Sequence, residues 1–330
     1  MMDAPEDVPS FKKFDYRVRL NKGTERKMMV EVFRRLAFFE LVENYRYIGF
    51  GATTFADFIL FHKELNITDM ISIEKYSEYE KRCRFNQPFD CITIYPDDSN
   101  NVLPKIPWDK RVIAWLDYDG RLTDAVRQDV SYSVSRVKSG SMVIVTVCAE
   151  GYLSYRGETP AHATKRFRKR FEQESRLNLP KNYEGKDLQG IDMANTCRKL
   201  IEDYIRISLE DRNGISSQEK IMLYRPLTNF VYKDGAQMLT VGGLFYESKD
   251  DMIVRQCLFE NLDFTSPGEG ELYEIKMPII TPRERYYLDQ KLPLGTYYDA
   301  INEFGLTQEE IDNYVCLYRF CPSYAEVGSI

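Results

Sequence analysis

Two glycines and two acidic residues have the types and spacing of a nucleoside-binding site. Gly49, Phe50 and Gly51 end a short apolar run and precede a helical pattern, and Glu74 follows 25 residues after Gly49. Glycines allow a tight turn and close approach of a ligand, and a nucleotide-binding βαβ unit places its ribose-binding acid at about this distance. Asp97 ends the next predicted strand. Because parallel strands end at one edge of a sheet, the spacing predicts that Glu74 and Asp97 share a ligand site.

The glycine pattern favours a nucleoside over a pyrophosphate ligand. From Gly49 the chain has the form G-x-G-x-x-x-x-A, with Ala56 as the small helix residue, and not the full G-x-G-x-x-G. A ligand such as S-adenosylmethionine needs only the turn and the acid. The alternative is that the two glycines merely shape a strand-to-helix turn.

Two further carboxylates, Asp117 and Asp119, are candidates for catalysis. They follow the apolar segment Arg111–Leu116, which is predicted to be a buried central strand. Side chains alternate along a strand, so both would face one cleft and could orient a nucleophile. The alternative is that Asp119 caps the helix starting near Leu122 and Asp117 holds a loop amide.

These residues need a sheet to bring them together, and the chain alternates strand and helix patterns throughout its first half. Alternation of this kind predicts a doubly wound, mostly parallel sheet of about seven strands. Asp234 and Gly235 join the last two strands, so the sheet should end in an antiparallel hairpin. The predicted strands are 47–50, 70–73, 91–95, 111–116, 141–148, 221–231 and 237–246, and the main helices are 24–44, 54–65, 76–84 and 122–137.

Two parts of the chain interrupt or follow this alternation. A helical insertion is predicted at about 151–218, inside a first domain that spans 1–247. The remainder, 248–330, is predicted to be a small α-rich unit, because Thr281 and Thr307 each begin a capping-box pattern. Its tyrosines could contact a protein partner or a second copy of the chain.

The insertion contains a run of basic residues with interleaved aromatics. Lys165, Arg166, Lys169 and Arg170 could contact nucleic-acid phosphates, because lysine and arginine displace counterions from the backbone. The alternative is a solvated helix face.

Composition limits the kinds of binding site and the locations that the chain can have. The chain has 330 residues, 43% hydrophobic content and a net charge of −6, so any nucleic-acid site must be a local basic patch. No apolar run reaches 18 residues and no export signal is present, so we expect no membrane span and a cytoplasmic location. Seven cysteines without C-x-x-C spacing indicate neither a zinc site nor a disulfide framework.

With these features placed, the first 247 residues resemble class I S-adenosylmethionine-dependent methyltransferases. Gly49-Phe50-Gly51 looks like the first motif of that family, Glu74 like its ribose-binding acid and Asp97 like the acid near the adenine. Asp117 to Gly120 would occupy the position of catalytic or substrate-binding groups. The resemblance implies S-adenosylmethionine as cofactor and methyl transfer to an unknown substrate, for which nucleic acid is one candidate.

Two other functions stay open at this point. One is a non-catalytic binding or assembly protein that keeps the fold or the nucleoside pocket. The other is a dinucleotide oxidoreductase, which the missing third glycine disfavours.

Overall fold

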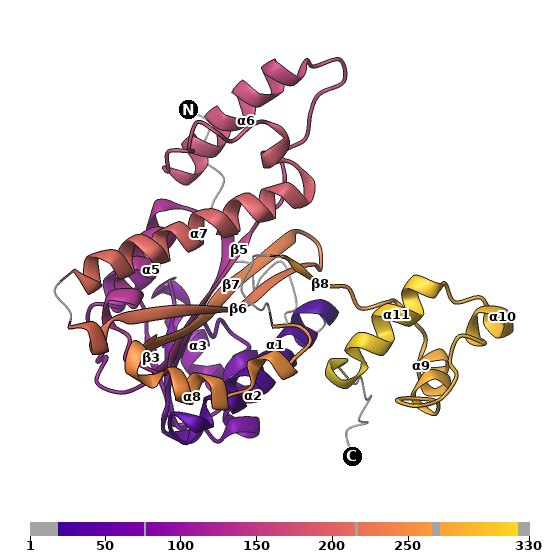
Figure 1. Cartoon of the computed structure of the whole chain (residues 1–330), viewed down its shortest axis with the longest axis horizontal. Helices are drawn as coiled ribbons and strands as arrows, with labels where there is room; N and C mark the ends of the chain where they lie inside the picture. Colours follow the sequence, from indigo (N-terminus) through magenta and orange to yellow (C-terminus); the bar gives the residue numbers. More distant parts are fainter. Residues whose placement is uncertain (1–18, 76, 215–216, 266–270, 323–330) are drawn as a thin grey trace.

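The computed structural model describes residues 19–75, 77–214, 217–265 and 271–322. Within these residues, one eight-stranded sheet forms the centre of the molecule (Figure 1). Its strands are β1 (Arg46–Gly49), β2 (Asp69–Ile73), β3 (Ile92–Tyr95), β4 (Val112–Arg121), β5 (Ser141–Cys148), β6 (Met222–Lys233), β7 (Gln237–Glu247) and β8 (Tyr273–Ile275).

The strand order is β3-β2-β1-β4-β5-β7-β6-β8. β1 to β5 are parallel to one another, and β7 is antiparallel to both β5 and β6. The predicted fold class and terminal hairpin are therefore confirmed. The sheet has one strand more than the expected seven, because the short β8 pairs in parallel with β6.

This order separates the fold from that of dinucleotide oxidoreductases, whose sheet runs 3-2-1-4-5-6 with all strands parallel. Here the antiparallel β7 lies between β5 and β6, in register from Ser141↔Phe245 to Cys148↔Met238. The topology thus disfavours the oxidoreductase alternative.

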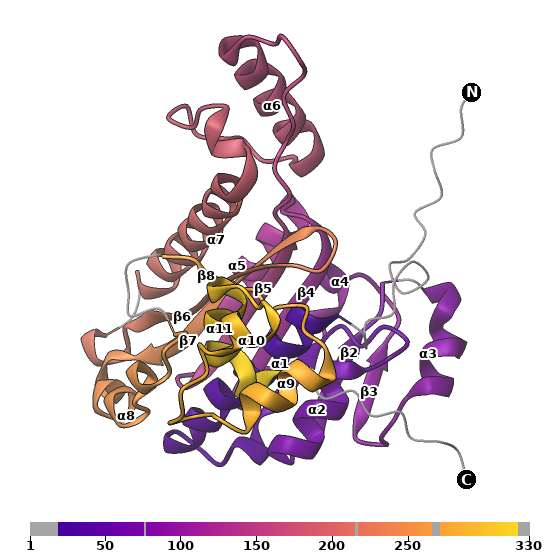
Figure 2. The same ribbon diagram turned by 90° about the vertical axis from the view of Figure 1, so that its right-hand side faces the viewer.

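Helices cover both faces of the sheet (Figures 1 and 2). They are α1 (Leu20–Arg34), α2 (Ala56–Leu65), α3 (Glu80–Asn86), α4 (Ser99–Val102), α5 (Asp124–Arg136), α6 (Pro160–Ser175), α7 (Gly190–Asn213), α8 (Asp251–Gln256), α9 (Pro282–Asp289), α10 (Ala300–Phe304) and α11 (Gln308–Leu317). Alternation along the strands divides the apolar side chains into two cores, one under α1 and α2 and one under α5 and α7.

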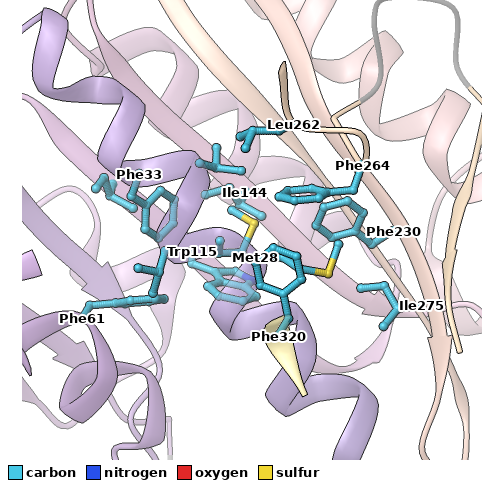
Figure 3. Packing of buried hydrophobic residues seen from close by; sticks show 14 of the residues in the cluster. Met28, Phe33, Phe61, Trp115, Ile144, Phe230, Leu262, Phe264, Ile275 and Phe320 are labelled. Carbon is cyan, nitrogen blue, oxygen red and sulfur yellow. The ribbon is translucent and has the colours of Figure 1, made fainter. Parts of the chain in front are cut away.

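The core under α1 also includes the C-terminal helices. Met28 and Phe33 of α1 pack with Trp115 of β4, Phe230 of β6 and Phe320 (Figure 3). Fully buried side chains of α9 and α11 belong to this same cluster, which joins the end of the chain to its beginning. Both predicted capping boxes are present, at Thr281 with Glu284 and at Thr307 with Glu310.

α1 differs from the predicted helix at both ends. It begins at Leu20 and ends at Arg34, where the prediction spanned 24–44. The chain tightens into a 3-10 turn over Arg35–Phe38. Leu41, which the predicted helix included among its apolar residues, is 61% exposed, so the apolar pattern continues past the point where packing supports a helix.

α6 stands away from the sheet in both views, beyond one end of α7 (Figures 1 and 2). Its N-terminus is capped by Thr159 and has Pro160 in its first turn, and Phe167 and Phe171 are buried on its inner side. No helix in the described part of the chain is long and apolar enough to cross a membrane.

Candidate functional site at the carboxyl edge of the sheet

The turn between β1 and α2 is tight and uses left-handed backbone at two non-glycine residues. Ala52 and Phe55 have φ of 49° and 48°, and Phe55 immediately precedes α2. This conformation explains why the helix starts at Ala56 and not at the expected Thr54. Left-handed geometry at a bulky residue is strained, and such strain collects at sites where the surroundings enforce it.

Both glycines of the turn lie against buried rings of the same chain. A Cβ at Gly49 would come 2.7 Å from the Tyr47 hydroxyl oxygen, and one at Gly51 would come 2.5 Å from a ring carbon of Phe55. Tyr47 and Phe55 are fully buried. Packing within the turn is therefore one reason for glycine at both positions.

Glu74 binds this turn directly. The Gly51 N–H donates to Glu74 Oε1 at 3.0 Å and also lies 3.0 Å from Ser72 Oγ, which itself donates to Glu74 Oε1 at 2.6 Å. The second carboxylate oxygen lies 3.9 Å from Cys83 Sγ, a weak donor. The structure therefore places Glu74 beside the glycine turn, as the sequence predicted.

Burial dominates the electrostatics of Glu74. The side chain is 8% exposed, and loss of solvation raises its pKa to about 7, although the hydrogen bonds from Ser72 and Gly51 favour the charged form. A carboxyl group with this pKa changes charge near neutral pH, which is common in functional sites.

Asp97 lies at the same edge but stabilises its own loop. Its Oδ1 accepts from the Asp98 N–H at 2.8 Å and from Asn101 Nδ2 at 2.9 Å, and Lys105 lies 3.2 Å from Oδ2. Its side chain is 40% exposed. Hydrogen bonds from Asn101 and the Asp98 amide lower the pKa of Asp97, so it remains ionised at neutral pH.

An aromatic pair between the glycine turn and β4 was not singled out from the sequence. The rings of Phe50 and Tyr118 meet edge to face with centroids 5.1 Å apart. The Tyr118 hydroxyl donates to Asp129 Oδ2 at 2.5 Å, and Asn100 Nδ2 donates to Asp129 Oδ1 at 2.5 Å. The sequence did offer one signal for this pair, an aromatic residue between Asp117 and Asp119. Because side chains alternate along a regular strand, Tyr118 is expected to face away from both aspartates.

The strand that carries Asp117 and Asp119 is longer than expected and continues to Arg121. The register of β4 with β5 shifts between Asp117 and Arg121, so regular alternation ends at Asp117 and does not hold the two aspartates on one side of the strand, as the sequence predicted. Neither caps the next helix, because the N-cap of α5 is Thr123, whose side chain accepts from the Val126 N–H. Asp119 is exposed.

Asp117 is paired with a buried lysine from α1. Lys22 Nζ lies 2.9 Å from Asp117 Oδ2 and 2.8 Å from Glu25 Oε2, and it lies 4.5 Å from the centroid of the Trp115 ring. The Lys22 and Glu25 side chains are 2% and 0% exposed, whereas that of Asp117 is 16% exposed. Desolvation alone would lower the pKa of Lys22, but attraction by Asp117 and Glu25 outweighs it and raises the pKa.

A second ion pair adjoins the first. Arg26 pairs with Asp57 at the start of α2, and the Tyr47 hydroxyl lies 3.4 Å from Asp57 Oδ2. We refer to Lys22, Glu25, Arg26, Asp57 and Asp117 as the α1 ionic network. Burial raises the pKa of Glu25, against the opposing effect of Lys22.

The hairpin tip fixes the start of α1 and so positions this network. Asp234 Oδ2 accepts from the Lys22 N–H at 2.9 Å, and its Oδ1 accepts from the Asn21 N–H at 3.2 Å. A carboxylate at a helix N-terminus satisfies free amide groups and complements the helix dipole. Asn21 Oδ1 in turn accepts from the Met277 N–H at 2.8 Å, which ties the C-terminal unit to the same point.

The basic residues of α6 divide into two kinds. Arg166 binds Glu158 through two nitrogens at 2.9 and 2.7 Å, and Arg170 binds Glu174 at 2.7 Å. Lys165 and Lys169 are exposed. The predicted group of four cations is thus partly neutralised by the chain's own carboxylates.

Comparison with known proteins gives one extensive match. A family model described as "Putative O-methyltransferase" matches residues 14–329. A search of curated proteins finds no match.

Several solved structures resemble the chain at low identity. A LepI complex with SAM shares 9% identity over 64% of this chain and 46% of LepI, with a TM-score of 0.38. The O-methyltransferase TomG from Streptomyces achromogenes, in complex with SAM, shares 10% over 67% and 79%, with a TM-score of 0.35. An O-methyltransferase family protein from Burkholderia thailandensis shares 10% over 67% and 56%, with a TM-score of 0.32. The chain spans about half of LepI bound to SAH, the Burkholderia protein, SibL and DesVI, at 43% to 56% of their lengths.

Proposed function

Because the chain belongs to this O-methyltransferase family, we propose that it transfers a methyl group from S-adenosylmethionine to an oxygen atom of an acceptor. S-adenosylmethionine supplies a methyl group on a positively charged sulfur, and the new C–O bond forms as the C–S bond breaks and its electron pair stays on sulfur. The protein's contribution is to bind and align the reactants, for which no histidine base is required.

Glu74 is the observation that carries the proposal. A carboxylate has about four acceptor positions, and the Gly51 N–H and the Ser72 hydroxyl use the same oxygen, Oε1. Ribose hydroxyls are donors that suit the second oxygen, Oε2, and would favour the ionised form of this buried group. The side chain therefore fits a ribose without giving up its bond to the turn.

Phe50, Tyr118 and Asp97 are suited to the adenine end of the cofactor. Aromatic rings stack with purine bases, and the exposed Asp97 carboxylate can accept from an exocyclic amine. Asp119, exposed in the part of β4 where the register with β5 shifts, is the group we assign to orienting the acceptor hydroxyl and accepting its proton.

Calorimetric titration tests this proposal without knowledge of the acceptor. The parent protein should bind both S-adenosylmethionine and S-adenosylhomocysteine, and Glu74→Ala should weaken both by roughly 10- to 100-fold, the scale for hydrogen bonds to a charged group. Glu64→Gln removes a carboxylate from a solvent-exposed ion pair with Arg34 and should leave both affinities unchanged. Failure of the parent protein to bind either ligand would reject the proposal.

A second function has one observation in its favour. Tyr47 and Phe55 fill the space beside the two glycines, as expected for a turn kept for its shape alone. A non-catalytic binding or assembly protein would need nothing more from the turn. The same titration separates the two functions, because such a protein need not bind the cofactor.

The acceptor could be a nucleic acid bound by the arm that contains α6. Residues 151–190 contain nine Lys and Arg against five Asp and Glu, so their net charge is +4, while the whole chain carries −6. Lys165 and Lys169 lie on the exposed side of this arm. Concentrated positive charge on a protruding element supports a polyanionic partner.

A protein partner or second copy could use the C-terminal unit. Ile279, Tyr286 and Leu294 of this unit are 95%, 72% and 96% exposed. Light scattering at several protein concentrations would reveal self-association.

A further inference from the structure

The α1 ionic network is an unusual feature of an otherwise apolar core. It lies between α1 and the sheet, beside Trp115, where the surrounding side chains are hydrophobic. The free-energy cost of removing an ion pair from water usually offsets the attraction between its charges. Apolar residues of similar size would therefore stabilise the fold at least as well. Retention of five charged side chains here points to a role beyond stability.

Asp117 is the member of the network that reaches the carboxyl edge of the sheet, where the glycine turn and Glu74 lie. β1 and β4 are parallel neighbours with Ile48 opposite Ala114. Gly51 and Asp117 each follow three residues later, so Asp117 lies at the level of the glycine turn, as the last β4 residue before the register with β5 shifts. Its 16% exposed side chain is also the most accessible of the five, since the other four are 0% to 9% exposed.

The charges of the network do not cancel. Lys22 and Arg26 face three carboxylates, so the ionised network carries one net negative charge. Tyr47 and Tyr232 also face it but are neutral, because burial raises the pKa of each well above its usual value. Glu25 neutralises Lys22, and the negative charge of Asp117 therefore remains effective toward the carboxyl edge of the sheet.

We propose that Asp117, held in place by Lys22, faces the cofactor's sulfonium and makes the site prefer S-adenosylmethionine over S-adenosylhomocysteine. This inference rests on the proposed function. Methyl transfer converts a positive sulfur to a neutral thioether, so a fixed negative charge attracts the substrate form and not the product. The arrangement would favour product release, with Lys22 and Glu25 as positioning residues that do not touch the cofactor.

The test compares two affinities and needs no acceptor. Titration of Asp117→Asn should show S-adenosylmethionine binding weakened by roughly tenfold, about 1.4 kcal/mol, with S-adenosylhomocysteine changed by less than about twofold. Glu25→Gln removes a charge that lies out of reach of the ligand. It should lower the ratio of S-adenosylmethionine affinity to S-adenosylhomocysteine affinity, by a smaller factor than Asp117→Asn does. Lys22→Met combined with Glu25→Gln removes both positioning residues but keeps Asp117 charged, so it should lower the preference for S-adenosylmethionine by a smaller factor than Asp117→Asn.

Asp97→Asn is the matched control, since it removes a carboxylate from the adenosine end common to both ligands. It should change both affinities by the same factor. Equal effects of Asp117→Asn on both ligands, or no effect on either, would overturn the inference. Should Asp117→Asn fail to fold, an unchanged ratio in Glu25→Gln would overturn it as well. Failure of the parent protein to bind both S-adenosylmethionine and S-adenosylhomocysteine would instead reject the proposed function.

Discussion

The pKa of Glu74 predicts a measurable dependence of stability on pH. The group has a pKa of about 7 in the folded chain, compared with an ordinary value of 4.5. Its protonated form is therefore favoured by folding. The stability it contributes is fully present below pH 4.5 and is lost as the pH rises through about 7.

The magnitude follows from the difference between these two values. About 2.5 pH units at 1.36 kcal/mol each correspond to about 3 kcal/mol. Glu74→Gln mimics the protonated carboxyl group at every pH. The variant and the parent protein should thus have similar unfolding free energies near pH 4.5, and the variant should be more stable by about 3 kcal/mol at pH 8.

Urea unfolding of both proteins between pH 4.5 and pH 8 measures this difference directly. Other titrating groups contribute equally to both proteins and cancel in the comparison. A difference that stays constant across this range would show that Glu74 has an ordinary pKa. A parent protein that gains stability relative to the variant as the pH rises would show that the hydrogen bonds from Gly51 and Ser72 outweigh burial.

Three other changes follow from the structure. Lys22→Met leaves two carboxylates without their cation and should destabilise the fold by about 3–5 kcal/mol in urea unfolding; a loss below about 1 kcal/mol would contradict the buried pair. Gly51→Ala places a methyl group 2.5 Å from the Phe55 ring and should lower stability by about 1–3 kcal/mol, whereas an unchanged melting temperature would show that the ring can move. If the α6 arm binds nucleic acid, Lys165→Ala with Lys169→Ala should reduce the slope of log K against log salt by about 1.4, measured by fluorescence anisotropy with single-stranded RNA. No binding by the parent protein at low salt would reject that partner.

The order of elements was determined by local sequence. β5 runs over Ser141–Cys148 as predicted, because a continuous apolar run fits only a strand buried on both faces. The hairpin was predictable from Asp234-Gly235, and Thr281 and Thr307 identified two helix starts. Parallel strands end at one edge of a sheet, so the order of strands and helices along the chain was enough to place Glu74 and Asp97 at the same edge.

Elements that depend on distant partners were not predictable in the same way. β8 has three residues, and its place in the main sheet depends on the edge that β6 offers. The end of α1 at Arg34 depends on what packs beneath the helix, since the apolar pattern itself continues.

The partners of the charged residues were decided by tertiary structure. In the sequence Lys22 looks like an ordinary surface residue and Asp117 like a candidate for catalysis, and neither shows that the two form a buried ion pair, because a charged side chain carries no local signal of burial. Lys22 is held inside by the Asp234 carboxylate 212 residues away and by α1 packing on the sheet. Conversely, Arg166 and Arg170 looked free for a ligand, but Glu158 and Glu174 neutralise them once α6 folds. Whether a charge is solvated, paired or directed at a ligand depends on which elements meet around it, and only the folded chain determines that.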